Sequence, residues 1–366
     1  MQPPSNTHAK RKILIVELWG LGDLTFTTPL IQGATGRDEV HLLAKPYAKE
    51  LLQPSYPAVQ FWAFDAPWTQ YTGKYNLLKW KWIALIGLIR RLRGEKFDLV
   101  VSVRSDPRDH VLAWLIGARQ RFGYPRLGSG LFLTDSGVKK KQHRLEDWLD
   151  IAGAIGFAGI ARKSSLNPSA NPWPKVSELF DSIHKPVICL HAGARIPVRR
   201  WPEAYFATII EKLRQQFDFH LILIPDPDGY GSGLAHYADT SMPNLSIGEL
   251  IDLLGRVDLL LCNDSGPGHI ASACGRPVIS FFGPESPQVF RPWGENNKVI
   301  IRDICPLRPC KDYCKFPEPY CMTQLMPDTV WPEIDQHLTT LVKKRVLPAA
   351  FMKAVVEVAE NRTERS

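Results

Sequence analysis

Residues 259–283 read LLLCNDSGPGHIASACGRPVISFFG, and this stretch decides the fold class. It begins with an apolar run, Leu259 to Cys262, that has the length of a buried strand. The turn Asp264 to His269 follows, and the next apolar residues have the spacing of a helical face. A second apolar run, Val278 to Phe282, completes the stretch. This order of strand, turn, helix and strand predicts one unit of a parallel α/β sheet.

The same alternation of strand-like runs and helical segments occurs in both halves of the chain. A capping box at Ser246 and Glu249 predicts the start of the helix that precedes Leu259. The other strand-like runs are Ile13 to Val16, Val40 to Leu43, Val59 to Phe64, Leu99 to Val103, Val187 to Leu190, Leu221 to Ile224 and Val299 to Ile301. We therefore predict two Rossmann-like, doubly wound α/β domains.

The length of the chain and its prolines predict where the domains divide. A chain of 366 residues exceeds what one hydrophobic core usually organises. Prolines are dense between residues 160 and 186, which favours neither a helix nor a central strand there. We predict an N-terminal domain at 1–165, a linker at 166–185, a C-terminal domain at 186–345 and a last helix within 346–366 that packs back on the N-terminal domain.

The composition indicates a globular protein of the cytoplasm, with 45% hydrophobic and 22% charged residues. No apolar run reaches the length needed to cross a bilayer or to form a secretory signal. The seven cysteines are expected to be reduced thiols. The net charge of +8 is uneven, because residues 1–180 hold 25 Lys and Arg against 15 Asp and Glu, while the rest hold 20 against 22. The basic first half predicts an anionic partner there.

The turn from Asp264 to His269 has the features of a phosphate site. It lies between the carboxyl end of a predicted strand and the start of a helix, where backbone N–H groups and the helix dipole favour an anion. Gly266 and Gly268 allow close approach of the backbone to a phosphate. The side chains of Ser265 and His269 can donate hydrogen bonds to it. The alternative is an ordinary helix cap.

Two further loops are predicted at the same edge of the second sheet. The strand that ends at Leu190 is followed by His191 and the small residues Ala192, Gly193 and Ala194, and then by Arg199 and Arg200. Small residues followed by an arginine pair suit a diphosphate. The strand that ends at Phe282 is followed by the loop 283–287.

With these motifs the chain resembles the heptosyltransferase family. Its members are glycosyltransferases of GT-B fold that move a heptose from ADP-heptose to the lipopolysaccharide core. The resemblance spans roughly residues 12 to 345. It rests on Gly20-Leu21-Gly22-Asp23 with Thr27-Thr28-Pro29, on His191-Ala192-Gly193-Ala194 with Arg199-Arg200-Trp201-Pro202, on Asn263 to His269 with Gly275, Pro277 and Phe282-Gly283-Pro284, and on the late cysteine segment that contains Cys310, Cys314 and Cys321.

The resemblance implies a GT-B fold, with two domains facing a cleft, and an inverting transfer. It assigns Asp23 as the general base that deprotonates the acceptor hydroxyl, whereas an N-cap is the alternative role. Arg199 and Arg200 are expected to neutralise the leaving diphosphate, so that no metal is obligatory and no cofactor is expected. Asp264 is expected to orient the turn or a donor hydroxyl. ADP-heptose is the implied donor.

The expected acceptor is a phosphorylated, lipid-linked core oligosaccharide. Arg104 and Arg108 follow the fourth strand of the basic half and suit its phosphates. The helix predicted at Leu77 to Arg93 combines tryptophans with basic residues, which suits either peripheral contact with the inner face of the cytoplasmic membrane or a core-facing helix with a solvated edge. No module typical of nucleic-acid binding is present, so nucleic acid is not an expected partner.

Departures from the family pattern keep alternatives open. Residues 224–229 read IPDPDG where the family typically has Gly-Gly-Pro-x-Glu, so another nucleotide sugar remains an alternative donor, and Asp228 is either a ribose ligand or a turn residue. A non-catalytic binding protein for phosphorylated sugars is a second alternative. An oxidoreductase is disfavoured because Thr25 replaces the third glycine of its motif. The four cysteines from Cys305 to Cys321 lack the usual zinc spacing.

Overall fold

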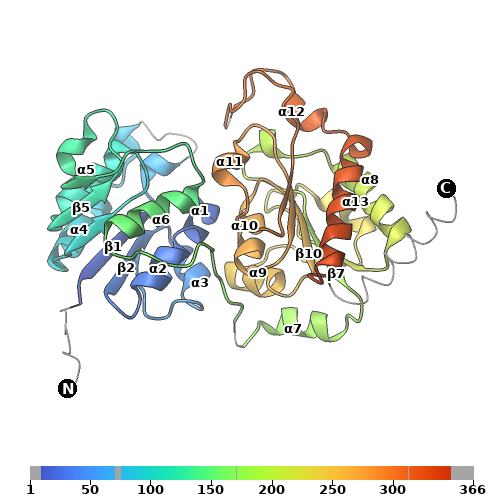
Figure 1. Cartoon of the computed structure of the whole chain (residues 1–366), viewed down its shortest axis with the longest axis horizontal. Coiled ribbons are helices and arrows are strands. Elements are labelled where there is room, and N and C mark those ends of the chain that lie inside the picture. Colours follow the sequence, from blue (N-terminus) through green and yellow to red (C-terminus); the bar gives the residue numbers. More distant parts are fainter. Residues whose placement is uncertain (1–9, 71–75, 170, 312, 348–366) are drawn as a thin grey trace. The chain divides into compact units, whose positions relative to one another are not determined.

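The computed structural model describes residues 10–70, 76–169, 171–311 and 313–347. The chain forms two compact units, Met1–Ser164 and Ser165–Ser366. Each unit contains one parallel six-stranded sheet with helices around it (Figure 1). The two doubly wound domains predicted from the sequence are therefore present.

The sheet of unit 1 has the strand order β3-β2-β1-β4-β5-β6. Its strands are β1 (Lys12–Glu17), β2 (Glu39–Ala44), β3 (Gln60–Ala63), β4 (Leu99–Val101), β5 (Gln120–Gly123) and β6 (Asp135–Ser136). Its helices are α1 (Leu21–Thr25), α2 (Thr28–Ala34), α3 (Ala48–Leu52), α4 (Trp82–Gly94), α5 (Pro107–Ile116) and α6 (Arg144–Ala154), with short 3-10 turns η1 (Pro67–Thr69), η2 (Leu77–Lys79) and η3 (Ser129–Phe132).

The central strand β1 is buried on both of its faces. Leu14 and Val16 pack with Leu88 and Leu92 of α4 on one side of the sheet. Ile13 and Ile15, which alternate with them and point to the other side, are equally buried. A parallel sheet needs this double cover, and it explains why the strand reads as a continuous apolar run.

The sheet of unit 2 has the strand order β12-β11-β10-β7-β8-β9. Its strands are β7 (Val187–His191), β8 (His220–Leu223), β9 (Thr240–Ser241), β10 (Leu259–Asn263), β11 (Val278–Phe281) and β12 (Lys298–Ile300). Its helices are α7 (Pro174–Asp181), α8 (Glu203–Gln216), α9 (Ile247–Leu254), α10 (Gly266–Ala273), α11 (Pro287–Phe290), α12 (Tyr320–Thr323) and α13 (Pro327–Lys343), with 3-10 turns η4 (Pro197–Arg199) and η5 (Ser232–Tyr237). The capping box predicted at Ser246 and Glu249 is confirmed at the start of α9.

Trp201 anchors the core of unit 2. Its ring is fully buried, and it stacks on Phe281 with ring centroids 4.0 Å apart and meets the edge of Phe206. Its indole N–H donates to the carbonyl of Leu325 at 2.8 Å, so that the buried polar atom is satisfied. This residue follows Arg200 directly, and its burial therefore holds the arginine pair in place.

The predicted linker differs from the structure. Residues 165–185 belong to unit 2, and they contain helix α7, which packs against α9. The expectation that the prolines exclude a helix here is wrong, because Pro174 occupies the first turn, where a missing N–H costs nothing. The buried carboxylate of Asp252 in α9 accepts the backbone N–H groups of Ser169 at 2.7 Å and Trp173 at 3.0 Å.

Other segments differ in smaller ways. The helix predicted to begin at Leu77 begins as the 3-10 turn η2, and the α-helix proper starts at Trp82. The short strands β5, β6 and β9 were not predicted, because two to four residues carry too little apolar pattern. The last helix, predicted within 346–366, falls on residues outside those described from 348 onward. None of the described helices is long and apolar enough to span a membrane.

We predict that Asp252→Ala releases the segment 165–185 from unit 2. Two backbone N–H groups would lose their acceptor, and we expect the free energy of unfolding to fall by about 3 kcal/mol. Limited proteolysis should then cut within 165–185 faster than in the wild-type protein. Asp218→Ala is the control, because Asp218 is 75% exposed and its ion pair with Lys185 should contribute little. Equal cleavage of both variants would contradict the prediction.

Candidate active site

The turn predicted to hold a phosphate lies where the sequence indicated. Strand β10 ends at Asn263, and α10 begins at Gly266, with Ser265 as its N-cap residue in an extended conformation. The Ser265 side chain makes no capping hydrogen bond to the helix. The first turn of an α-helix has backbone N–H groups that find no partner within the helix, so this end of α10 suits an anion.

Two glycines of this region are required by packing within the protein. A Cβ atom on Gly268 would lie 2.9 Å from the Cys262 sulfur. One on Gly193 would lie 2.5 Å from the side chain of Asp226. The sequence explained Gly268 by the approach of a ligand, whereas the structure gives an internal reason for both glycines.

Arg199 is held by two buried carboxylates. Its Nη1 lies 3.0 Å from Asp264 Oδ2, and its Nη2 lies 3.3 Å from Glu285 Oε2. Asp264 follows β10, and Glu285 lies in the loop after β11. Asp264 thus orients an arginine, while Glu285 is a residue that sequence reasoning missed. Its only signal was its place in the loop 283–287.

Arg200 is held by the neighbouring loop on the other side. Its Nη2 contacts Asp226 at 2.9 Å and Asp228 at 2.5 Å, and its Nε donates to the carbonyl oxygen of Ala194 at 2.9 Å. The guanidinium also lies over the ring of Tyr230, 4.6 Å from its centroid. Among the described residues, its Nη1 donates to no protein atom and is available to an anionic ligand.

Asp228 has the turn role that the sequence left as one of two alternatives. Its Oδ1 accepts the backbone N–H of Tyr230 at 3.0 Å, while its Oδ2 faces Arg200. Hydrogen bonding to Arg200 is the main cause that lowers the pKa of this exposed carboxyl.

Asn263 fastens the loops of this site together. Its side-chain amide donates to the carbonyl oxygen of Ala192 at 2.5 Å, and its Oδ1 accepts the backbone N–H of Trp201 at 3.1 Å. The side chain is fully buried at the end of β10. Two loops that are far apart in the sequence are therefore fixed by one amide, which the sequence marked only as part of a resemblance.

His269 is nearly buried in the first turn of α10. His191 ends β7 and bonds the carbonyl oxygen of Ile224 through its Nδ1 at 3.0 Å. Burial lowers the pKa of His191, so this ring is neutral near pH 7.

The candidate base of unit 1, Asp23, lies in the short helix α1. Its Oδ2 accepts the backbone N–H of Gly20 at 3.2 Å, so the carboxylate stabilises the start of its own helix. Its Oδ1 lies 2.5 Å from Nη2 of Arg104 and 3.9 Å from Nε of Arg144. A structural role and a fixed carboxylate therefore coexist at this residue.

The two residues expected to bind the acceptor have different surroundings. Arg104 pairs with Asp23, lies 3.8 Å from Glu17 Oε1, and packs over the ring of Trp19 at 4.7 Å. Arg108 instead forms two hydrogen bonds with Asp106, the N-cap residue of α5, at 2.8 and 2.6 Å. The structure thus brings Arg104 to the candidate base and pairs Arg108 with Asp106.

Glu17 is a second residue that the sequence analysis missed. It is fully buried at the end of β1, and its Oε1 accepts the backbone N–H of Trp19 at 3.2 Å. Burial raises its pKa to about 7, while Arg104 opposes this and Asp23 adds to it. The available signal was a charged residue between Val16 and Leu18 in an otherwise apolar run.

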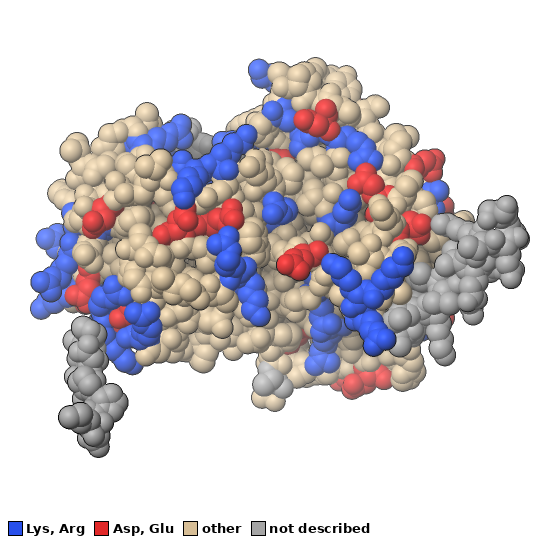
Figure 2. Space-filling view, in the orientation of Figure 1, with Lys and Arg blue, Asp and Glu red and all other residues tan. Residues whose placement is uncertain are grey.

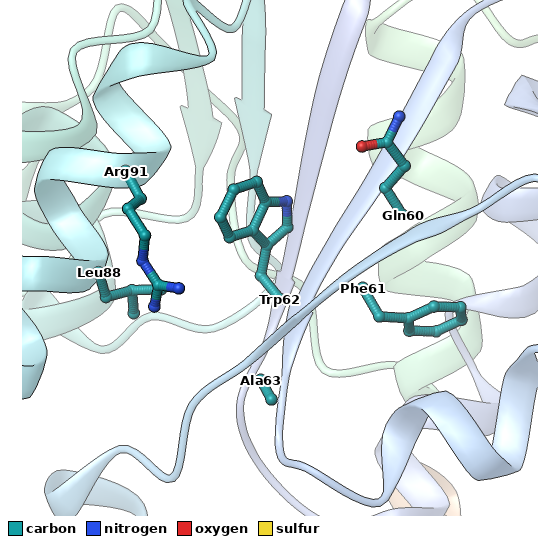
Figure 3. Close-up of a pocket in the computed structure, with 6 residues that line it drawn as sticks. All are labelled: Gln60, Phe61, Trp62, Ala63, Leu88 and Arg91. Carbon is teal, nitrogen blue, oxygen red and sulfur yellow. The ribbon is translucent and has the colours of Figure 1, made fainter.

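A separate pocket of about 310 Å³ lies at the outer edge of the sheet of unit 1. Edge strand β3 and helix α4 line it, and Figure 3 shows the Arg91 side chain extending from α4 toward the ring of Trp62. Strand β3 is two strands away from β1, which Asp23 follows. The pocket is therefore a feature apart from the candidate base.

The seven cysteines are free thiols in the structure. Cys321 is buried, and Cys305, Cys310 and Cys314 are half-buried in the loop that precedes α12. Within the described ranges, no group of three or more His, Cys, Asp or Glu side chains is placed to hold a metal ion.

A family model and a curated relative both point to the same family of proteins. The model of glycosyltransferase family 9 (heptosyltransferase) matches residues 85–320, which is more than half of the chain. The lipopolysaccharide core heptosyltransferase OpsX of Haemophilus influenzae is 21% identical over 323 residues, covering 81% of this chain and 86% of that protein.

Solved structures show the same fold. E. coli ADP-heptose lps heptosyltransferase II matches with a TM-score of 0.67 at 18% identity, over 90% of this chain and 99% of that one. E. coli heptosyltransferase WaaC with ADP-2-deoxy-2-fluoro heptose matches with a TM-score of 0.63 at 18% identity, over 89% and 99%. The GT-B fold class predicted from the sequence is confirmed.

We predict that Glu17 makes stability depend on pH. Because its pKa is about 7 in the folded protein and 4.5 as an ordinary glutamate, the folded state binds the proton more tightly. Its contribution is full below pH 4.5 and is lost as the pH rises to 7, by on the order of 3 kcal/mol. Glu17→Gln should remove this slope, which urea unfolding at several pH values measures. Parallel pH profiles of variant and wild type would contradict the assignment.

Proposed function

The chain belongs to glycosyltransferase family 9, the heptosyltransferase family, and we propose from this membership that it moves a heptose from ADP-heptose to a lipopolysaccharide core acceptor with inversion. The match of residues 85–320 to that family carries the proposal. It makes the protein a glycosyltransferase, which disfavours both the oxidoreductase and the non-catalytic binding protein. OpsX and WaaC, by their names and bound ligand, support the acceptor and the donor.

Unit 2 binds the donor in this proposal. The diphosphate lies at the N-terminus of α10, where backbone N–H groups and the helix dipole stabilise its charge. Arg200 donates to it through Nη1. Arg199 reaches it while held between Asp264 and Glu285. Ser265 and His269 bond its oxygens, and the residues Gly193 and Ala194 line the approach.

Unit 1 supplies the base. The acceptor oxygen attacks the anomeric carbon and its proton passes to Asp23, while the bond from carbon to the diphosphate breaks and its electrons remain on the leaving oxygen. A direct displacement of this kind inverts the anomeric configuration. Arg104 holds the Asp23 carboxylate in place through their ion pair. The helix N-terminus and the arginines supply the charge that stabilises the leaving group, so the proposed reaction is metal-independent.

The proposed acceptor is phosphorylated and lipid-linked, and the enzyme acts from the cytoplasm at the inner face of the cytoplasmic membrane. The positive net charge of residues 1–180 supports an anionic acceptor on this unit. Arg104 and Arg108 are its proposed phosphate ligands. Each of them is already paired with a carboxylate, so an acceptor phosphate has to share the guanidinium.

A different nucleotide sugar is the second candidate donor. The observation that favours it is the loop 224–229, which departs from the family pattern. In this chain the loop uses Asp226 and Asp228 to bind Arg200, and not a glutamate to bind ribose. The reaction type is the same for both candidates.

We predict that Asp23→Asn retains ADP binding and loses transfer. The amide keeps the size of the side chain but accepts no proton, so turnover should fall by about a thousandfold. An assay of ADP release from ADP-heptose, with a core oligosaccharide as the acceptor, measures this loss. Asp38→Asn is the control, since Asp38 is a carboxylate of the same unit that pairs with Arg11. Wild-type turnover in Asp23→Asn would exclude this residue as the base.

We predict that ADP stabilises the protein against heat more than UDP, GDP or NAD does. A ligand that binds only the folded state raises the melting temperature, and at equal concentration the ligand with the lower Kd raises it more. Arg200→Ala should weaken ADP binding by about tenfold, because it removes a charged donor. Arg214→Ala is its control, because Arg214 pairs with Asp239 at the surface. Preferential stabilisation by UDP or GDP would support the second candidate donor.

A further inference from the structure

Helix α4 leaves an apolar surface uncovered. Its inner side is formed by Leu85, Leu88 and Leu92, which are buried against the sheet of unit 1. On the outer side, Ile83 is 91% exposed, while Trp82 and Ile86 are 45% and 47% exposed. A helix that only covers a core has one apolar side, so the second apolar group requires its own explanation.

The turn before the helix extends this apolar group. Leu78 in η2 is 96% exposed and Leu77 is 54% exposed. Trp82 donates its indole N–H to the carbonyl oxygen of Leu77 at 2.9 Å, which ties the turn to the start of α4. Five large apolar side chains therefore share one exposed segment, which we call the α4 surface.

Positive charge surrounds the α4 surface. Residues 76–94 contain five basic residues and no Asp or Glu. Lys81, Arg90 and Arg93 are exposed. Arg90 and Arg93 are four and seven residues after Ile86, so the helical repeat puts them on the same outer side. Figure 2 shows Lys and Arg side chains gathered at the edge of unit 1 where Figure 1 draws α4.

We propose that the α4 surface docks the protein onto an anionic lipid bilayer, with Leu78, Trp82, Ile83 and Ile86 entering the interface and the cations contacting lipid phosphates. A short amphipathic helix of this composition lies in the plane of a membrane interface. The acyl boundary accepts the apolar group, and an anionic headgroup layer complements the charge.

Other occupants fit less well. In a symmetric contact between two copies the same segment is present on both sides, and it has no Asp or Glu, so Arg90 and Arg93 would meet no carboxylate of that segment on the second copy. Bound nucleic acid would satisfy the charge but would leave Leu78, Ile83 and Ile86 without an apolar partner. Only a surface that is both apolar and anionic matches the whole segment.

The docking does not require any step of the proposed transfer reaction. None of the residues of the α4 surface belongs to the proposed donor or base sites. Binding to lipid and transfer to a soluble acceptor are therefore separable. A failure of the docking proposal would show as absent lipid binding, whereas a failure of the proposed function would show as absent transfer to any acceptor.

Co-sedimentation of the full chain with vesicles tests the proposal. We expect binding to vesicles of phosphatidylcholine with 30% phosphatidylglycerol, and much weaker binding to phosphatidylcholine alone. Arg90→Glu with Arg93→Glu should weaken the binding at least about twentyfold, since each basic residue near an anionic surface contributes about fivefold. Ile83→Asp should weaken it about tenfold through the loss of an inserted apolar group.

Matched controls exclude general effects. Val138→Asp changes an 84% exposed apolar residue of the same unit, and Lys49→Glu with Lys163→Glu makes the same change of net charge on exposed residues of that unit outside α4. Both controls should bind like the wild type. Equal losses in variants and controls, no binding to anionic vesicles, or dimers in lipid-free solution that Ile83→Asp dissociates would each overturn the proposal.

Discussion

Both candidate sites depend on the order of strands in their parallel sheets. In each unit the chain adds strands to one side of the first strand, then returns and adds the next strand on the other side, so that β1 lies beside β4 and β7 beside β10. The loops after two such neighbours run in opposite directions, which is where α/β proteins bind ligands. Asp23 follows β1 and Arg104 follows β4, and the two meet. The loop after β7 meets Asn263 at the end of β10.

The arginines of these sites share one electrostatic arrangement. Arg104 lies between Glu17 and Asp23, Arg199 between Asp264 and Glu285, and Arg200 between Asp226 and Asp228. In unit 2 the carboxylates that hold Arg199 lie in the loops after β10 and β11, on one side of β7, and those that hold Arg200 lie in the loop after β8, on the other side. The two arginines are therefore held in opposite directions. Fixed guanidinium groups lose little entropy when an anion binds. Because carboxylates already offset the positive charge of Arg199 and Arg200, the N–H groups at the start of α10 have to provide much of the stabilisation of a bound anion.

The sequence predicted the scaffold far better than the pairing of side chains. Apolar runs and the capping box at Ser246 located the strands and helices of both sheets, because local periodicity and capping are sequence signals. The partners of Arg200 are 26 and 28 residues away, and those of Arg199 are 65 and 86 away, so no local pattern identifies them. Glu17 follows the apolar run Ile13 to Val16 directly, so its place in the sequence indicated only the end of a strand. The prolines of 166–185 concealed a helix, because a proline in the first turn looks the same as one in a loop.

The net charges of the two halves of the chain also suit the different ligands proposed for them. Residues 181–366, which hold the proposed donor site, carry a small excess of Asp and Glu, so they cannot attract a diphosphate by net charge. Recognition there has to come from groups at close range, such as the N-terminus of α10 and Arg200, which act over a few ångströms and are shielded from salt. The excess of basic residues in 1–180 acts at longer range. Long-range attraction suits a partner that is a surface, and close-range hydrogen bonding suits a small molecule that diffuses to its site.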